Sequence, residues 1–522
     1  MKKIFSILVV CAVAVSATAV PARRGGVTRT AADGTEKTVF LNGDEKFHYL
    51  TDAQGNMLDE TTLEPLSEEV KAARMAQGQE RVKIRRAQQE TGTDRLLSPR
   101  GAVILVSYKD KAFSSTNEQM VEWAMGENYT HNGATGSIHQ YFLDQSWGEY
   151  DLQIDVYGPV KVSKNLSYYG SNSGWGGDDA HADELVVEAC KLAHDSCGAD
   201  FSQYDFDNDG KVDWVVILYA GYGEASGAPS NTIWPHQYEL SYTNKDFVLD
   251  GKTVDHYCCL NELTGTSGKV RDGIGTFCHE FSHVMGLPDL YATDNSSHHT
   301  MVDWDIMDYG CYNNSGNTPP CYSAYERWFM GWVTPRVLTD PENVKLHLLN
   351  DTKEALLMCS GDAHNLDGIS PNPKTFYLME ARSKSDLIWD KYLPGEGMLI
   401  TKIQYDKSKW ANNIVNNTSS KMGVDLMEAK TNNGDLGKAT DAYPKGAASF
   451  TKFSDHEITE IEWDAAQGLI TFLYRGGAED PGPHEAIEDV ESTVTAKKVI
   501  RDGKVLILRN GHSYDLTGKQ ID

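Results

Sequence analysis

Apolar residues follow two different periods in the middle of the chain. Continuous apolar runs at 102–106 and 214–219 have the composition and length of strands that are buried on both faces. The segment 117–125 is expected to be a helix, and apolar residues at helical spacing predict another helix over 185–193. Because strands and helices alternate in this order, we predict an α/β domain over residues 101–340.

Beyond this domain the pattern changes to strands alone. Four short runs predict a β-rich domain over 341–475, at 344–349, 376–380, 397–403 and 469–474. A linker rich in Gly, Pro and acidic residues follows at 476–483, and the segment 497–511 has the pattern strand, Asp-Gly turn, strand. A lone hairpin cannot bury a face in water, so the β tail within 476–522 either joins a small sandwich or is a signal that other machinery recognises.

The N-terminus carries the pattern of a secretory signal over residues 1–19. Lys2 and Lys3 precede an apolar run over 4–15, and the small residues that end at Ala19 suit cleavage after that position. No later apolar run is long enough to span a bilayer. We therefore expect a protein that is exported to the medium or the outer cell surface and has no transmembrane segment.

Composition limits the class of partner. Hydrophobic residues make up 40% and charged residues 24% of the 522 positions, which is typical of a globular chain with several domains. The formal net charge of −27 at pH 7 argues against nucleic acid, because phosphate binding requires clustered Lys and Arg.

Cysteine use fits an oxidising compartment without demanding disulfides. The chain has nine cysteines, of which Cys11 lies in the predicted signal. Cys311 with Cys321 is the one disulfide that we expect. No C-x-x-C pair occurs, so a thiolate zinc site is not predicted.

The strongest chemical signal is H-E-F-S-H-V-M-G-L-P-D, which starts at His279 within a predicted helix at 276–285. His279 and His283 lie four residues apart on one helix face, so both imidazoles can bind one Zn²⁺, with Glu280 beside them as general base. Gly286 can end the helix, which lets Asp289 turn back towards the metal as a third ligand. Such a set leaves a fourth position open for water.

The third ligand is the least certain part of this prediction. Asp303, Asp305 and Asp308 lie downstream and could replace Asp289. A bare H-E-x-x-H is also compatible with a helix that carries two surface histidines. The added Gly and Asp favour the metal site, as does a hydrophobic turn over 304–310 whose Met307 could form an apolar floor under the zinc.

These motifs together resemble those of the M6 metallopeptidases, the immune inhibitor A-like secreted proteases of bacteria. The resemblance runs from about Leu41 to Leu473. Besides the metal segment and the turn around Met307, it rests on the stretches 146–148, 168–169, 233–236, 323–327 and 331–332. The spacing H-E-x-x-H-x-x-G-x-x-D is similar to the metzincin pattern, with aspartate in place of the third histidine. The resemblance implies a metzincin-like zincin catalytic domain.

The resemblance also implies a zymogen. It makes residues 20–100 a pro-segment that covers the cleft, although the polar composition of this stretch is also that of a small independent β module. Arg95 and Arg100 lie on an apparent polar linker where an activating protease could cut. No cysteine occurs between Val20 and Arg100, which excludes a cysteine switch. The tail that ends at 514–518 resembles the sorting tails of the Bacteroidetes type IX secretion system.

Two further groups are candidate site residues. Tyr309 matches the tyrosine that follows the Met-turn in the astacin and serralysin relatives, and Tyr312 is the other candidate for a phenol that stabilises the oxyanion. Acidic residues alternate before a glycine in a loop that suits a structural Ca²⁺, with the candidate ligands Asp205, Asp207, Asp209 and Asp213. The twelfth position of this loop is Val216 rather than Glu, so an EF-hand is not predicted. An acidic turn that precedes a strand is the alternative.

The predicted function is that of a secreted zinc endopeptidase acting on proteins or peptides. Glu280 would accept the proton of a zinc-activated water and pass it to the leaving amine. The alternative is a catalytically silent secreted binding protein or adhesin on the same scaffold. The presence of Glu280 argues against it, because a site without catalysis has no need of the base. A sugar or acyl-amide substrate is a second alternative, which the family resemblance disfavours.

Overall fold

The structure is a computed structural model that describes residues 19–83, 100–172, 177–243, 245–385, 388–431 and 437–478, together with 497–501, 504–509, 512–514 and residue 519. The chain divides into two compact units, of which the first ends at Gly477 and the second begins at Ala478. Most of the predicted signal segment and Arg95 lie outside the described residues. Among the residues described, no helix combines the length and the apolar character that crossing a membrane requires.

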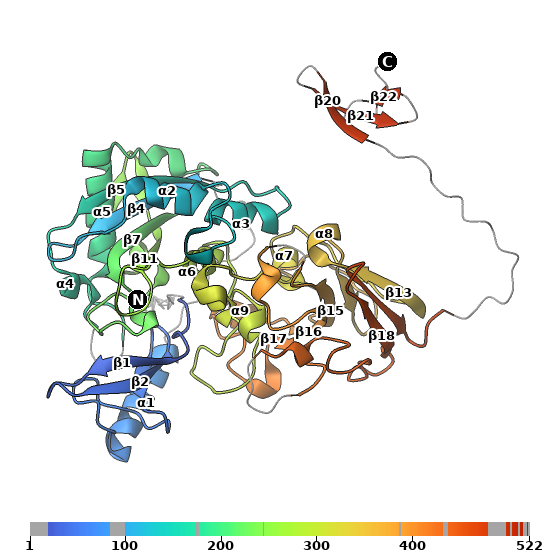
Figure 1. Cartoon of the computed structure of the whole chain (residues 1–522), viewed down its shortest axis with the longest axis horizontal. Helices are drawn as coiled ribbons and strands as arrows, with labels where there is room; N and C mark the ends of the chain where they lie inside the picture. The colour runs from blue at the N-terminus through green and yellow to red at the C-terminus, as the bar shows by residue number, and fades with distance from the viewer. Residues whose placement is uncertain are drawn as a thin grey trace, which may run out of the picture. The chain divides into compact units, whose positions relative to one another are not determined.

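Residues 19–83 form an N-terminal module, drawn in blue in Figure 1. Its antiparallel sheet has the order β1-β2-β3, and one helix follows the sheet. The elements are β1 (Gly26–Thr30), β2 (Glu36–Gly43), β3 (His48–Thr51) and α1 (Glu68–Lys83). Val39 and Leu50 are buried, so the short alternating stretches of this polar segment do form a packed sheet.

A five-stranded sheet of order β5-β4-β7-β11-β8 organises the next part of the chain. Its strands are β4 (Arg100–Ser107), β5 (Gln153–Lys161), β7 (Val215–Tyr222), β8 (His236–Glu239) and β11 (His256–Leu263). Neighbouring strands are parallel except for β8, which is antiparallel at one edge. Val103 of β4 lies opposite Val216 of β7 and both are buried, which explains why these strands are apolar throughout.

Helices connect these strands and cover the sheet (Figure 1). They are α2 (Asn117–Met125), α3 (Ile138–Gln145), α4 (Leu166–Gly170) and α5 (Ala182–Cys197). A capping box between Thr116 and Gln119 starts α2, and Gly198 with a φ of +72° ends α5. The mixed α/β architecture predicted from the alternating pattern is confirmed. A small sheet lies beside it, with β6 (Lys211–Val212), β10 (Lys252–Val254) and β9 (Val248–Leu249) in that order.

The helix α6 (Gly275–Val284) follows β11 and carries the H-E-x-x-H segment. All of its residues are buried. The 3₁₀ helix η7 (Tyr309–Gly316) packs against it, and α7 (Ala324–Phe329) follows. A helix that is buried all round places its histidines in the protein interior, which excludes two surface histidines as the explanation of the motif.

Two sheets make up the β-rich part. One has the order β12-β14-β15-β16-β17 and the other β13-β19-β18. The strands are β12 (Arg336–Val337), β13 (Glu342–His347), β14 (Leu356–Met358), β15 (Thr375–Arg382), β16 (Gly397–Gln404), β17 (Val424–Leu426), β18 (Ile458–Asp464) and β19 (Leu469–Tyr474), with short helices α8 (Leu349–Thr352) and α9 (Lys407–Ala411). The β-rich part belongs to the same compact unit as the α/β part. Arg382 joins the two parts, because it donates to the Cys321 carbonyl and pairs with Asp390 at 2.6 Å.

The second compact unit contains the predicted hairpin and one additional strand. β20 (Lys497–Arg501), β21 (Lys504–Arg509) and β22 (His512–Tyr514) form an antiparallel sheet in that order. The linker expected from residue 476 agrees with the division between Gly477 and Ala478.

The structure corrects two expectations. Cys311 and Cys321 do not form the expected disulfide. The carbonyl of Cys311 packs against Gly275, whereas the backbone of Cys321 is held by Asp390 and Arg382, so different contacts hold the two residues. Arg100, expected on an open linker, starts β4 and pairs there with Gln153 of β5.

Candidate metal centre

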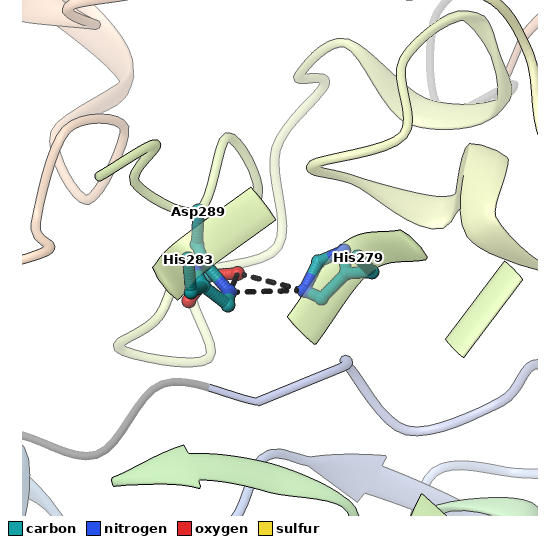
Figure 2. Close-up of side chains that lie close together, drawn as sticks. All are labelled: His279, His283 and Asp289. Carbon is teal, nitrogen blue, oxygen red and sulfur yellow. Dashed lines mark hydrogen bonds and ion pairs between the residues drawn. The ribbon is translucent and has the colours of Figure 1, made fainter. Parts of the chain in front are cut away.

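Two imidazoles and one carboxylate converge on a single point (Figure 2). His279 Nε2 and His283 Nε2 lie 3.1 Å apart. Asp289 Oδ1 lies 3.2 Å from the first nitrogen and 3.1 Å from the second. Asp289 reaches this point because Gly286 has a φ of +95° and turns the chain back after α6. All three side chains are buried.

Hydrogen bonds to the backbone determine which imidazole nitrogens face this point. His279 Nδ1 lies 2.7 Å from the Ile306 carbonyl, and His283 Nδ1 lies 2.8 Å from the Leu287 carbonyl. A carbonyl can only accept, so each Nδ1 carries the proton and each Nε2 presents a lone pair.

Three lone pairs that converge inside a protein require a cation. With both histidines in this tautomer, Asp289 Oδ1 has no hydrogen-bond donor. Two nitrogens and one oxygen form a ligand set that suits Zn²⁺, so the residues present fit a catalytic metal.

Glu280 lies next to this cluster and is fully buried. Burial is the main cause that raises the pKa of its carboxyl well above the ordinary value, and the nearby Asp289 adds to this effect. Glu280 Oε1 accepts a hydrogen bond of 2.7 Å from the backbone N–H of Val20.

The residues Ala19–Arg24, here called the strap, lie in the site. Tyr291 donates from its hydroxyl to the Ala19 carbonyl at 2.7 Å, and the Trp234 indole donates to the Val20 carbonyl at 3.0 Å. Ala19 is 0% and Val20 is 1% exposed. The base of the predicted mechanism therefore faces a segment from the N-terminal module.

Both candidate tyrosines contact the strap. The hydroxyl of Tyr312 donates to the Pro21 carbonyl at 2.7 Å. The guanidinium of Arg24 lies 3.5 Å from the centre of the Tyr309 ring. Burial raises the pKa of Tyr309 to about 12.

The three alternative third ligands are occupied elsewhere. Asp303 pairs with Arg24, and Asp305 Oδ1 accepts from the Met307 N–H. Asp308 accepts from Thr300, Val302 and Tyr309. Among the described residues, Asp289 is the carboxylate that joins the two histidines. Met307 is buried, and the carbonyl of the preceding residue is the one that binds His279 Nδ1.

The acidic loop brings together three of its four predicted calcium ligands. Oxygens of Asp205, Asp207 and Asp209 lie within 4.8 Å of one another. Asp213 lies outside this group; its carboxylate accepts from the Phe206 N–H, and burial raises its pKa to about 6. In this arrangement the Lys252 ammonium lies 2.5 Å from Asp205 Oδ2.

The sequence did not predict two contributions to the metal centre. The strap contacts Glu280 across 260 positions of the chain, and Asn413 of the β-rich part contacts Asp289 across 124. No local spacing relates residues so far apart, so only the tertiary structure could reveal them.

A mixed α/β domain whose buried helix presents two imidazoles, a nearby carboxylate and an adjacent glutamate has the groups that a metal-dependent hydrolase uses. The comparisons name the family. Residues 106–333 match the catalytic domain of the immune inhibitor A peptidases, M6. The resemblance inferred from the motifs is confirmed over these residues.

Individual relatives match over part of their length. The chain is 28% identical over 247 residues to the pre-pro-metalloprotease PrtV of Vibrio cholerae serotype O1, covering 43% of this chain and 25% of the relative. It is 29% identical over 218 residues to immune inhibitor A of Bacillus thuringiensis subsp. alesti, covering 37% of this chain and 31% of the relative. A putative secreted metallopeptidase of Arthroderma benhamiae is 22% identical over 214 residues. The chain thus covers about a quarter to a third of the length of its curated relatives.

Proposed function

We propose that this protein is a zinc-dependent endopeptidase that hydrolyses peptide bonds of protein substrates and is made as a secreted zymogen. The observation that carries the proposal is the convergence of the lone pairs of His279, His283 and Asp289 beside the buried Glu280. The match to a metallopeptidase family implies a metal, and the nitrogen and oxygen ligand set suits zinc.

Zn²⁺ held by these three residues would polarise the scissile carbonyl and lower the pKa of a water molecule. Glu280 would accept the proton of the attacking water and deliver it to the leaving amine. The carbonyls of Ile306 and Leu287 hold the two imidazole rings in the orientation that binding requires.

A phenol would stabilise the oxyanion of the tetrahedral intermediate. Tyr309 remains a candidate and Tyr312 the other. The contact of the Tyr312 hydroxyl with the Pro21 carbonyl supports Tyr312 as a donor to peptide carbonyls in the cleft. Tyr309 lies beside it under the guanidinium of Arg24.

The zymogen proposal rests on the strap and on the module that carries it. From Val20 onward the strap engages Glu280, Trp234 and Tyr312, so a substrate cannot reach the base while the strap is in place. Residues 20–100 would therefore be the pro-segment, and an activating protease would cut before β4. The name of one relative, a pre-pro-metalloprotease, supports a signal and a pro-segment here as well.

Three finer points complete the proposal. A relative named as a secreted metallopeptidase supports export through the predicted signal. A structural Ca²⁺ would bind Asp205, Asp207 and Asp209 after displacing the Lys252 ammonium, with Asp213 nearby. Secretion machinery would recognise the β tail within residues 476–522.

The test compares the secreted mature enzyme with its Glu280→Gln variant on a denatured protein substrate. We expect equal zinc content in the two proteins and a loss of roughly 100-fold or more in the hydrolysis rate of the variant, because general base catalysis is removed. Chelation should abolish the wild-type activity and added zinc should restore it. A zinc-loaded mature wild type that cleaves nothing would contradict the proposal and support a binding protein on the same scaffold.

A further inference from the structure

Asp289 is the one member of the metal cluster that does not belong to α6, and a separate part of the molecule holds it. Its carboxylate Oδ1 faces the two imidazoles. Its other oxygen, Oδ2, accepts a hydrogen bond of 2.5 Å from Asn413 Nδ2. The backbone N–H of Asp289 donates to Asn413 Oδ1 at 2.7 Å. One side-chain amide thus binds the same residue twice.

This pair of hydrogen bonds determines the orientation of both groups. The backbone N–H of Asp289 can only donate, so the oxygen of the Asn413 amide must face it. The NH₂ group must then face the carboxylate, which fixes the side-chain torsions of Asp289. Since Asn413 occupies one carboxylate oxygen, the other is directed to the metal position. Asn413 is 1% exposed, so water does not compete for these bonds.

The loop that carries Asn413 is itself rigidly attached to the segment after α6. Asn413 has a φ of +50°, a conformation that asparagine adopts more readily than most residues. Its carbonyl accepts from the Thr293 hydroxyl at 2.8 Å. Asn416 donates to the Leu290 carbonyl at 2.7 Å, and Asn417 accepts from the Thr293 N–H at 2.9 Å.

The loop belongs to the β-rich part, between α9 and β17. It lies outside residues 106–333, which match the family's catalytic domain. The β-rich part therefore supplies contacts to the metal centre as well as packing.

We propose that Asn413 is the positioning residue of Asp289 and that the β-rich part thereby completes the metal centre of the α/β part. This inference rests on the proposed zinc function. Outer partners of metal ligands orient those ligands, and their loss typically weakens metal binding by roughly 10- to 100-fold. Without Asn413, Asp289 would be free to turn away from the imidazoles, so the cost falls on metal affinity more than on the fold.

The decisive variant is Asn413→Asp, with Asn417→Ala as its matched control. Asp has nearly the shape of Asn and keeps the acceptor for the Asp289 N–H, but it places a second carboxylate against Asp289 Oδ2. Asn417 lies in the same loop and holds Thr293, so its loss loosens the loop without touching a member of the metal cluster. Asn413→Ala, which removes the amide without adding charge, is the third variant.

Zinc affinity of the full chain is measured by competition with a chromophoric chelator, and the melting temperature is measured on metal-free protein. We expect both Asn413 variants to bind zinc at least roughly 10-fold more weakly than wild type, with Asn417→Ala within about 2-fold. Melting temperatures of metal-free Asn413→Ala and Asn417→Ala should fall by similar amounts. The visible absorption of the Co²⁺-loaded protein should change in the Asn413 variants alone.

Two results would overturn the inference. One is unchanged zinc affinity in Asn413→Asp and Asn413→Ala, and the other is an equal loss of affinity in Asn417→Ala, which would assign the effect to loop order. A wild type that binds no zinc would instead refute the proposed function itself. Hydrolysis that survives in zinc-loaded Glu280→Gln would refute the proposed mechanism and leave the role of Asn413 standing.

Discussion

His279 and His283 each donate from Nδ1 to a backbone carbonyl, and these two bonds determine the chemistry of the cluster at the residue scale. The acceptor for His279 is the carbonyl of Ile306, directly before Met307. The hydrophobic turn expected to form an apolar floor therefore also fixes the tautomer of an imidazole. The spacing of the motif indicates which residues can meet, whereas these bonds decide which atoms meet.

Replacement of Asp289 by Ala tests the third ligand. We expect Asp289→Ala to weaken zinc binding by more than the roughly 100-fold that loss of an outer partner costs, because an atom in contact with the metal is lost. Asp303→Ala is the control, since Asp303 pairs with Arg24 outside the cluster. Zinc per chain after gel filtration at a fixed chelator concentration distinguishes the two variants. Full zinc occupancy in Asp289→Ala would assign the third ligand elsewhere.

The start of α6 and the residues just before it lie very close to the backbone of η7. A Cβ added at Gly275 would lie 1.9 Å from the Cys311 carbonyl oxygen, and one at Gly273 would lie 2.0 Å from the Gly316 carbonyl oxygen. Glycine at these two positions lets η7 approach the start of the helix that carries His279. At the scale of elements, the site therefore depends on a close contact between α6 and η7.

Gly275→Ala tests this contact. We expect it to lower stability by about 1–3 kcal/mol, as overpacking of a core does, and to weaken zinc binding because α6 must shift relative to η7. Thermal unfolding of the metal-free protein and zinc affinity together measure the effect. Gly361→Ala is the control for backbone strain without overpacking, because Gly361 has a φ of +75° and no atom lies within 4 Å of the added carbon. Zinc affinity unchanged in Gly275→Ala would show that the contact does not govern the metal centre.

The N-terminal module docks on the α/β part through a buried ion pair as well as through the strap, and this contact acts at the scale of the whole first unit. His48 Nε2 of β3 lies 3.2 Å from Glu224 Oε1, and the His48 ring stacks on Trp234 with the ring centres 4.7 Å apart. Burial lowers the pKa of His48, but the carboxylates of Glu224 and Glu60 and the Asp44 carbonyl outweigh it, and the pKa is raised above 6.5. The docked state therefore favours protonated His48.

The linked pH dependence follows from the direction of this shift. Because the folded-state pKa of His48 is raised, its contribution to stability is complete below 6.5 and is lost as the pH rises through the folded-state value. We expect the difference in melting temperature between wild type and His48→Gln to be largest below pH 6.5 and to shrink as the pH rises through the folded-state pKa of His48. His347→Gln, at a side chain that is 47% exposed, is the control. A difference that stays constant or grows with pH would contradict the assignment.

Much of the fold could be predicted, because buried apolar residues recur along the sequence at the spacing of the helix or strand that carries them. The predicted helix 117–125 matches α2. The run at 102–106 lies within β4, and the run at 214–219 begins one residue before β7. Errors arose where tertiary contacts override local character. Arg100 looks like part of a polar linker, but it is a strand residue because β5 is available to pair with it. Cys311 and Cys321 lie close in sequence, yet separate packing contacts hold them.

The sequence by itself indicated the class of chemistry and the two candidate ligands that come from one helix. Two histidines one helical turn apart must face the same way, and Glu280 must lie next to them, because the geometry of a helix is local. Only the tertiary structure decided that Asp289 rather than Asp303, Asp305 or Asp308 completes the cluster. Likewise, only the fold brought the strap to Glu280 and Asn413 to Asp289. These contacts join residues 260 and 124 positions apart, and such contacts depend on how the sheets and helices pack, which no local spacing records.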